Sequence, residues 1–312
     1  MNTFAIILPT LTITFVGYWV ARKSWLSRSE CDATAKFVFT YVLPCLLFIG
    51  TAKAKIPDDM AWQFLFSYYI VVLGVYVCAI LIGKFFFDYN DAEQSVFGMG
   101  ASYSNATIVG IPICVYSLGE QALLPVFIII SIHNLALFMT GILVAERNTL
   151  SLSSFFSDLM VMIRQLLANP ITGSLAAGGL VNVLNIPIYL PIEEAISSMS
   201  KAAIPAALFV LGTSLNKYKL QGHITSALCM VTLKIVLLPL GVAFLVFHVF
   251  TIDPLWAASA VLTSAMPVGV SAYIFSQKYT VIEAPIASAI VISTLASVVT
   301  LSVVLSFLPT IN

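Results

Sequence analysis

Long apolar segments follow one another along almost the whole chain. A membrane-spanning helix needs about 20 mostly apolar residues. Ten segments meet this requirement, and the loops between them are too short to hold a soluble domain. They cover residues 3–21, 33–52, 61–87, 94–117, 121–145, 160–184, 193–215, 222–250, 254–277 and 282–308. The sequence therefore predicts an all-α polytopic membrane protein with ten transmembrane helices in a lipid bilayer.

The composition excludes several other classes of protein. Charged residues make up 9% of the chain, against about 25% in soluble domains, and the formal net charge is zero, so we expect no nucleic acid partner. The five cysteines show no C-x-x-C spacing, and no metal site or cofactor is expected. A nucleotide-binding motif of the form GxxxxGK[ST] is absent. The first apolar segment has no basic residues before it, so we interpret it as a retained span.

The two halves of the chain resemble each other at an offset of 161 to 163 residues. The matching pairs are Pro9 and Pro170, Gly17 and Gly178, Pro44 and Pro205, Phe48 and Phe209, Asp91 and Asp253, and Glu120 and Glu283. Each half then holds five spans, and an odd repeat must insert its second copy upside down. The sequence predicts two inverted five-helix repeats, residues 1–150 and residues 151–312, as in many secondary transporters.

Lysine and arginine are more frequent in the loops on one side of the predicted membrane. Ten of them follow odd-numbered spans and three lie on the opposite side. The first group is Arg22, Lys23, Arg28, Lys36, Lys84, Arg147, Arg164, Lys217, Lys219 and Lys278, and the second is Lys53, Lys55 and Lys201. Because positively charged loops stay in the cytoplasm, both termini are predicted to lie outside it.

Two of the ten spans contain small, polar and helix-breaking residues where an unbroken membrane helix would be apolar. The fourth span reads Ser-Tyr-Ser-Asn-Ala-Thr-Ile-Val-Gly-Ile-Pro over 102–112, and the ninth reads Ser-Ala-Met-Pro-Val-Gly-Val-Ser over 264–271. Lipid cannot hydrogen-bond the backbone groups that such breaks release, so the breaks must be covered by protein or line a cavity. Interrupted spans at matching positions of two halves indicate the midplane site of a transporter.

These segments resemble the auxin efflux carrier family of membrane transporters. The resemblance lies in the stretch from Asn105 to Pro112, in Met266-Pro267-Val268-Gly269 followed by Ala-Tyr-Ile-Phe, in Lys-Ile-Val-Leu-Leu-Pro over 234–239, and in Ser-Thr-Leu over 293–295. It covers essentially the whole chain. Each motif is short and apolar, and their order and spacing strengthen the match.

The resemblance implies a fold similar to that of bile-acid sodium symporters, with two inverted five-helix repeats in which helices 4 and 9 are broken and cross each other. Spans 1, 2, 6 and 7 would form a scaffold, and spans 3–5 and 8–10 a moving transport domain. It also implies a small organic anion as substrate, a carboxylate such as malate, malonate or auxin, and it leaves a homodimer open. The chain has only residues 146–158 between its halves, which departs from the large plant carriers and favours a compact prokaryotic member in a bacterial inner membrane.

Asn105 is the first candidate for binding the anion, together with its neighbours Ser104, Ala106 and Thr107. Its amide offers two donors, and an unwound helix would add free N–H groups and the positive end of a half-helix. The alternative is an asparagine that ties two helices together, which is common in membrane bundles.

The ninth span is expected to contribute Pro267, Val268, Gly269 and Ser271 to the same site. Proline removes a hydrogen-bond donor and frees a carbonyl one turn back. The alternative is an ordinary kink, since proline is tolerated in membrane helices. Pro112 either lines the site or only kinks the fourth span.

Lys234 is the one basic residue deep inside a predicted span, about eleven residues from its start. At 1.5 Å per residue it lies roughly 16 Å deep, too far to snorkel to the headgroups. It could attract an anionic substrate, or replace a coupling sodium ion by neutralising carbonyls and half-helix ends. The alternative is a structural lysine satisfied by carbonyls.

His133, next to Asn134, is the one candidate for a titrating coupling group, because the carboxylates fall in loops or at span ends. A structural, hydrogen-bonding histidine is the alternative. Ser293 and Thr294 of the tenth span could line the site, or bond only to the preceding turn of their own helix.

These observations favour a secondary carrier for a small organic anion, working by elevator-type alternating access. A channel or a receptor on the same fold is the alternative, although paired breaks favour alternating access. An intramembrane enzyme is disfavoured because the sequence offers neither a GxSxG motif nor paired acids at depth.

Overall fold

The computed structural model describes residues 3–54, 62–148, 159–161, 163–164, 168–216 and 222–308. Apart from one isolated backbone bridge, the regular structure in these ranges is helical. The chain forms two compact units: unit 1 is Met1–Met60, Ile111–Ile128 and Met162–Lys217, and unit 2 is Ala61–Gly110, Ile129–Val161 and Tyr218–Asn312. Both units combine segments from both halves of the sequence, so neither of them is a predicted repeat.

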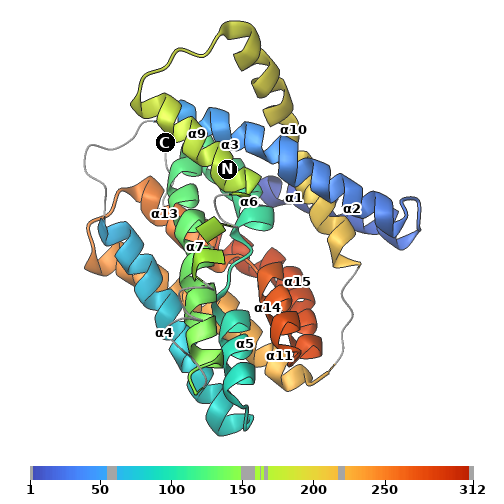
Figure 1. The fold of residues 1–312 in the computed structure, drawn as a ribbon, viewed down its shortest axis with the longest axis vertical. Helices are drawn as coiled ribbons and strands as arrows, with labels where there is room; N and C mark the ends of the chain where they lie inside the picture. Colours follow the sequence, from blue (N-terminus) through green and yellow to red (C-terminus); the bar gives the residue numbers. More distant parts are fainter. Residues whose placement is uncertain are drawn as a thin grey trace. The chain divides into compact units, whose positions relative to one another are not determined.

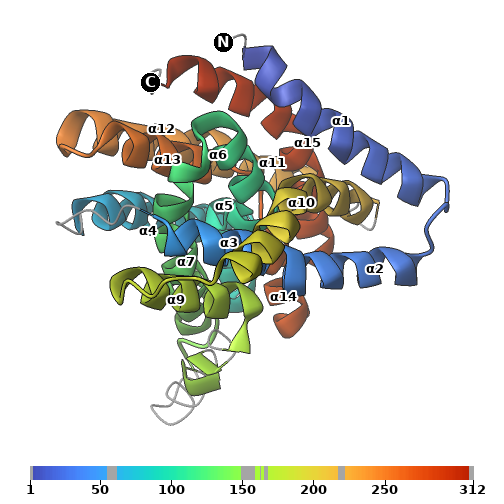
Figure 2. The same cartoon turned by 90° about the horizontal axis from the view of Figure 1, so that it is seen from above.

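The helices of unit 1 come from the beginning and the middle of the chain. They are α1 (Thr3–Arg22), α2 (Arg28–Phe37), η1 (Val38–Val42), α3 (Leu43–Ala52), α6 (Ile111–Leu118), η3 (Glu120–Ala122), α9 (Pro170–Val183) and α10 (Leu190–Leu215). The α1 helix packs against α10, and α3 packs against both α9 and α10. Figure 1 and Figure 2 both show α3 and α9 side by side.

Glycines set the closest helix contacts in unit 1. A Cβ atom added to Gly17 of α1 would lie 2.1 Å from the backbone oxygen of Phe209 in α10. One added to Gly178 of α9 would lie 2.5 Å from the backbone oxygen of Phe48 in α3. Small residues let membrane helices approach this closely. The predicted repeat makes Gly17 equivalent to Gly178 and Phe48 equivalent to Phe209. Each half of the chain therefore supplies one glycine and one of the backbone segments that the glycines approach.

Unit 2 holds the remaining helices and most of α7 (Leu123–Ala145). They are α4 (Trp62–Phe86), α5 (Asp91–Ser102), η2 (Ala106–Gly110), α11 (Ile224–Thr232), η4 (Leu233–Leu237), α12 (Leu238–Phe244), η5 (Leu245–Val249), α13 (Pro254–Ala265), α14 (Val270–Tyr279) and α15 (Glu283–Phe307). The α15 helix packs against α11 and α14, and these three lie together in Figure 1.

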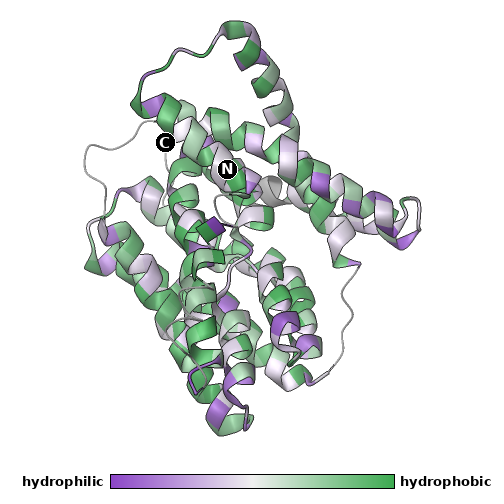
Figure 3. Ribbon diagram, in the orientation of Figure 1, coloured by the Kyte–Doolittle hydropathy of each residue, from purple (hydrophilic) through white to green (hydrophobic). Residues whose placement is uncertain are grey.

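The α4 helix is apolar on all sides, as a helix in contact with lipid should be. Its exposed face carries a stripe of large apolar side chains at spacings of three and four residues: Phe66, Ile70, Leu73, Val77 and Leu81. The opposite face is buried in unit 2. Figure 3 shows hydrophobic residues along most of α4. A soluble helix would be polar on its outer face, so this pattern favours a membrane environment.

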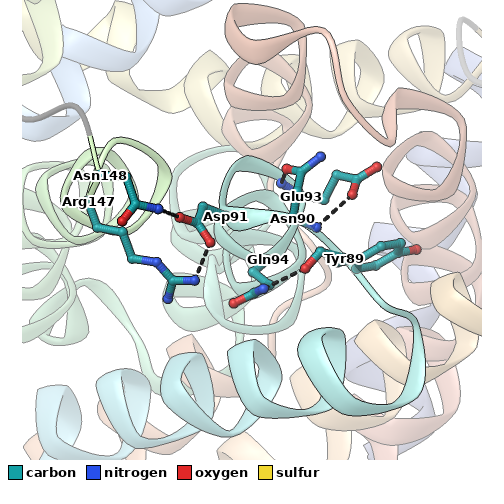
Figure 4. Close-up of polar contacts among 7 residues, drawn as sticks. All are labelled: Tyr89, Asn90, Asp91, Glu93, Gln94, Arg147 and Asn148. Carbon is teal, nitrogen blue, oxygen red and sulfur yellow. Dashed lines mark hydrogen bonds and ion pairs between the residues drawn. The ribbon is translucent and has the colours of Figure 1, made fainter.

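Polar contacts fix the start of α5, the first half of the fourth predicted span (Figure 4). Asn90 and Glu93 form a reciprocal capping box, in which the Glu93 N–H donates to Asn90 Oδ1 at 3.0 Å. Asp91 accepts hydrogen bonds from the side chains of Arg147 and Asn148, just after α7. These contacts position α5 against the end of α7 within unit 2.

The helices agree with the predicted spans wherever the structure describes them, with 160–184 described only in part. Six helical stretches in the described ranges are long and apolar enough to cross a membrane. The polytopic all-α class is thus supported, whereas the number of ten spans and their inverted repeat stay predictions. The predicted repeat boundary at residues 150 and 151 lies outside the described residues, as do Lys55, Lys217 and Lys219.

Candidate functional site

The fourth and ninth predicted spans both break, and the two breaks pair with each other in unit 2. The α5 helix ends at Ser102 and η2 begins at Ala106, while α13 ends at Ala265 and α14 begins at Val270. Ser104 and Val268 form an antiparallel bridge between the two extended segments. Two backbone hydrogen bonds flank it, from Asn105 N–H to the Pro267 oxygen and from Gly269 N–H to the Tyr103 oxygen, each 2.9 Å long.

The residue types at the bridge explain why it forms there. Pro267 has no N–H and cannot continue the helix, but its carbonyl accepts a bond from the other segment. A Cβ atom added to Gly269 would lie 2.5 Å from the Tyr103 ring and 3.2 Å from the Ser104 backbone carbon. Only glycine therefore allows the two segments to come this close. We call the residues 103–105 and 267–269 the crossing.

Two helices begin at the crossing with unused backbone donors. Among the described residues, the N–H groups of Ala106 and Thr107 at the start of η2 make no hydrogen bond, and neither do those of Val270 and Ser271 at the start of α14. The first N–H groups of a helix lack partners within the helix and carry partial positive charge. Both helix starts are therefore suited to a negatively charged group.

The side-chain amide of Asn105 also lacks a protein partner. Asn105 is 6% exposed, and its amide makes no hydrogen bond to any residue that the structure describes. Its backbone is fully used, because the carbonyl accepts bonds from Val109 and Gly110 at 3.2 and 3.0 Å. Since the described residues supply no partner, a ligand or water must complete the hydrogen bonds of this amide. Thr107, the second residue of η2, is half-buried.

Lys234 lies in η4 and is completely buried. Its Nζ donates a 2.6 Å hydrogen bond to the backbone oxygen of Ser264, in the last turn of α13. The end of a helix carries partial negative charge, so the lysine stabilises the half-helix that stops at the crossing. Among the described residues it has no carboxylate partner, and Ser264 is its single hydrogen-bond acceptor.

Side chains from the two following helices hold the outer edges of the crossing. The Ser104 N–H donates to Nε2 of His133 in α7 at 3.1 Å. The Val268 N–H donates to Oγ of Ser293 in α15 at 3.0 Å. Ser104 and Val268 are partners in the bridge, so the two halves of the site use the same arrangement with different side chains.

The other predicted residues have more local roles. The Tyr103 hydroxyl donates to the Asn134 side-chain oxygen, and Ser271 contacts Tyr103. The Thr294 hydroxyl donates to the Ile290 oxygen of its own helix, and its role as a lining residue stays a prediction. Pro112 belongs to unit 1, and its role as a lining residue stays a prediction.

Sequence reasoning missed two residues of this site, Tyr103 and Ser264. Tyr103 packs on His133 with ring centroids 4.8 Å apart and contributes a backbone acceptor to the crossing. Its place next to the break was the available signal. Ser264 acts through its backbone oxygen, which no side-chain pattern could have indicated. Among the described residues there is no group of three or more histidine, cysteine, aspartate or glutamate side chains that could hold a metal ion.

Comparisons with known proteins agree with these observations. The sequence model of a family described as "Membrane transport protein" matches residues 3–305. A protein of Rhizobium meliloti named "Putative malonate transporter" is 25% identical over 297 residues, which cover 95% of this chain and 93% of the relative. The "Uncharacterized transporter YfdV" of Escherichia coli K12 is 23% identical over 305 residues, which cover 96% of both chains.

Proposed function

The chain belongs to the membrane transport protein family, and on that basis we propose that it is a secondary carrier for a small organic anion bound at the crossing. Family membership and the transporter relatives make it a transport protein of the membrane rather than an enzyme. The observation that carries the anion proposal is the buried Asn105 amide without a partner, next to two helix starts with unused N–H groups.

A carboxylate fits the donors at the crossing. Its two oxygens accept several hydrogen bonds, and the crossing offers the Asn105 amide and the backbone N–H groups of Ala106, Thr107, Val270 and Ser271. Hydrogen bonds to an ionised acceptor are stronger than those between neutral groups. The anion therefore regains in the site the hydrogen bonds that it loses on leaving water.

Lys234 supplies the fixed positive charge of the site. It binds the end of α13 through Ser264, three residues before Pro267, so its charge acts where the chain breaks. We propose that this ammonium takes the place of a coupling sodium ion at the freed carbonyl, and that it also favours an anion nearby. The structural role through Ser264 and the electrostatic role are compatible, because one hydrogen bond leaves two of its three N–H donors unused.

One of the two relatives supports the substrate class of small carboxylates through its name. The name of the Rhizobium meliloti relative refers to malonate, a small dicarboxylate. We propose that this chain carries a carboxylate of similar size. Its proposed location is a bacterial inner membrane with both termini outside the cytoplasm, and a homodimer remains part of the proposal.

Elevator-type alternating access is the proposed mechanism. The crossing, α4 and α11–α15 belong to unit 2, and the glycine contacts between α1 and α10 and between α9 and α3 belong to unit 1. We propose that the unit 2 helices move with the bound anion while the unit 1 helices serve as a scaffold. The matched glycine contacts support an inverted repeat, because they exchange equivalent residues between the two halves.

A flux screen in proteoliposomes tests this function. Purified protein would be reconstituted and offered labelled mono- and dicarboxylates under imposed pH, sodium and voltage gradients. A carrier gives saturable flux that is stimulated by unlabelled anion on the other side of the membrane. Flux that rises linearly with concentration would identify a channel instead, and binding without flux would identify a receptor.

A further inference from the structure

The hydrogen bond between Ser104 and His133 fixes where the imidazole carries its proton. The backbone N–H of Ser104 is a donor, so Nε2 of His133 must accept with its lone pair. In a neutral imidazole the proton then lies on Nδ1. That nitrogen is buried and has no hydrogen-bond partner among the described residues. The crossing in this structure therefore requires a His133 that is unprotonated at Nε2.

The equivalent position in the other half shows that this role does not need a histidine. Ser293 accepts the Val268 N–H at 3.0 Å and donates its own hydroxyl proton to the Ile290 oxygen at 3.1 Å. A hydroxyl keeps its acceptor lone pair throughout the physiological pH range, whereas an imidazole loses the Nε2 lone pair when it binds a proton. The two halves therefore differ in one property, which is sensitivity to protons.

The groups around His133 offer it no negative charge. From α4, the Tyr68 and Tyr69 rings lie with centroids 6.0 and 6.2 Å from the imidazole, and Tyr103 lies at 4.8 Å. Lys234 of η4 adds a positive charge at the end of α13, where it donates to the Ser264 oxygen. Among the described residues, no carboxylate is paired with His133 or Lys234. A protonated His133 would thus be a second positive charge beside the crossing, with no counter-charge from this part of the protein.

We propose that His133 is a positioning residue that links proton binding to the shape of the crossing and to anion binding. Protonation places a hydrogen on Nε2, so two donors face each other and the bond to Ser104 is lost. The Ser104 N–H is then released, and the added positive charge favours an anion at the crossing. This inference rests on the proposed function, because it names the coupling ion of the same site.

Thermodynamic linkage between proton binding and anion binding determines whether anion affinity rises or falls with pH. If the protonated protein binds the anion more tightly, the bound anion must favour protonation by the same factor. Anion affinity should therefore rise as pH falls. When one proton is taken up per anion, the change approaches about tenfold per pH unit. Below the pH at which His133 is already protonated in the anion-free protein, anion affinity should no longer depend on pH.

The first test uses the protein without any anion. The chain has three histidines, His133, His223 and His248, of which the last two are exposed. In the double variant His223→Gln and His248→Gln, nitrogen NMR of labelled histidine should report a neutral ring protonated at Nδ1 near pH 8. A ring protonated at Nε2 would overturn the proposal. This result does not depend on any substrate, so it separates the inference from the proposed function.

Hydrogen exchange of the backbone over residues 102–106 gives a second readout without anion. After correction for the intrinsic pH dependence of exchange, we expect wild-type protection to fall as the pH is lowered stepwise from about 8 to the lowest pH at which the protein stays folded. In His133→Gln the amide oxygen can replace Nε2 as the acceptor but cannot bind a proton in this range, so protection should not change with pH. Loss of protection in the variant as steep as in the wild type would contradict the proposal.

The third test measures the affinity for malonate as the probe anion, in wild type, His133→Gln and the control His248→Gln. The affinity of wild type and control should increase several-fold for each unit that the pH falls, and His133→Gln should be nearly flat. Comparison with His133→Gln removes any contribution from ionisation of malonate or of Lys234. Equal slopes in all three proteins would overturn the linkage. If malonate and the other small carboxylates bind none of them, the proposed function fails, while the NMR and exchange tests still decide the role of His133.

Discussion

Replacement of Asn105 by alanine should weaken anion binding while leaving the stability of the protein nearly unchanged. The side-chain amide has no hydrogen-bond partner among the described residues, so its removal breaks no hydrogen bond to them. The effect on the free energy of unfolding should stay within about 1 kcal/mol. A bound carboxylate would lose a hydrogen bond to a charged acceptor, which costs about 1.5–3 kcal/mol, or roughly a 10- to 150-fold weaker affinity.

Asn182 offers a matched control in unit 1. Its Nδ2 lies 3.0, 2.9 and 2.8 Å from the backbone oxygens of Thr51, Ala52 and Ala54 at the end of α3. Replacement of this amide by alanine removes bonds within the protein and should lower stability by about 1–3 kcal/mol. The affinity of the molecules that remain folded should be unchanged. We therefore expect Asn105→Ala to lose anion affinity and keep its stability, and Asn182→Ala to lose stability and keep its affinity.

The assay combines thermal unfolding in detergent with binding of labelled malonate to the same samples. Asn105→Ala should melt close to wild type and bind at least tenfold more weakly, whereas Asn182→Ala should melt lower and bind normally. The reasoning would be refuted if Asn105→Ala bound malonate as well as the wild type does. It would also be refuted if the variant melted as low as Asn182→Ala, because the amide would then be a structural group.

Three further changes test other parts of the account. Gly269→Ala should push the Tyr103 ring from the crossing and destabilise unit 2 by about 1–3 kcal/mol, measured by thermal unfolding; an unchanged melting temperature and flux would contradict the close approach. In folded Lys234→Gln, flux should fall at least tenfold and its ion dependence should change, with no full rescue by Lys234→Arg; wild-type flux would leave the lysine with its structural bond to Ser264. Gly17→Ala should separate α1 from α10 and cost about 1–3 kcal/mol or more, and normal thermal stability would argue against that contact.

Local residue chemistry made the breaks predictable. Pro267 cannot donate a hydrogen bond, and Gly269 tolerates a close backbone, so the end of α13 could be located from the sequence alone. The start of α5 at Asp91 lies three residues before the predicted span, and the capping-box spacing of Asn90 and Glu93 was the signal that could have located it. The helix bounds agree with the predicted spans because hydrophobic length is the main constraint on a membrane helix.

The partners of the site residues could not be predicted in the same way. The acceptors of the Ser104 and Val268 N–H groups lie 29 and 25 residues further along the chain, and the lysine finds its carbonyl 30 residues away. Such pairings depend on how helices pack, which a local pattern does not encode. His133 was predicted either as a titrating group or as a hydrogen-bonding one. The geometry at Nε2 shows the hydrogen bond, and the titrating role is the proposal made above.

Counterflow of labelled malonate in proteoliposomes tests the central claim most directly. Vesicles loaded with unlabelled malonate and diluted into a trace of labelled malonate should accumulate the label transiently, because a carrier exchanges one bound anion for another. Asn105→Ala should lose most of this accumulation, and Asn182→Ala should keep it in proportion to the amount of folded protein. Absence of counterflow with malonate and with every other small carboxylate, from wild-type protein shown to be folded, would contradict a carboxylate carrier with its site at the crossing.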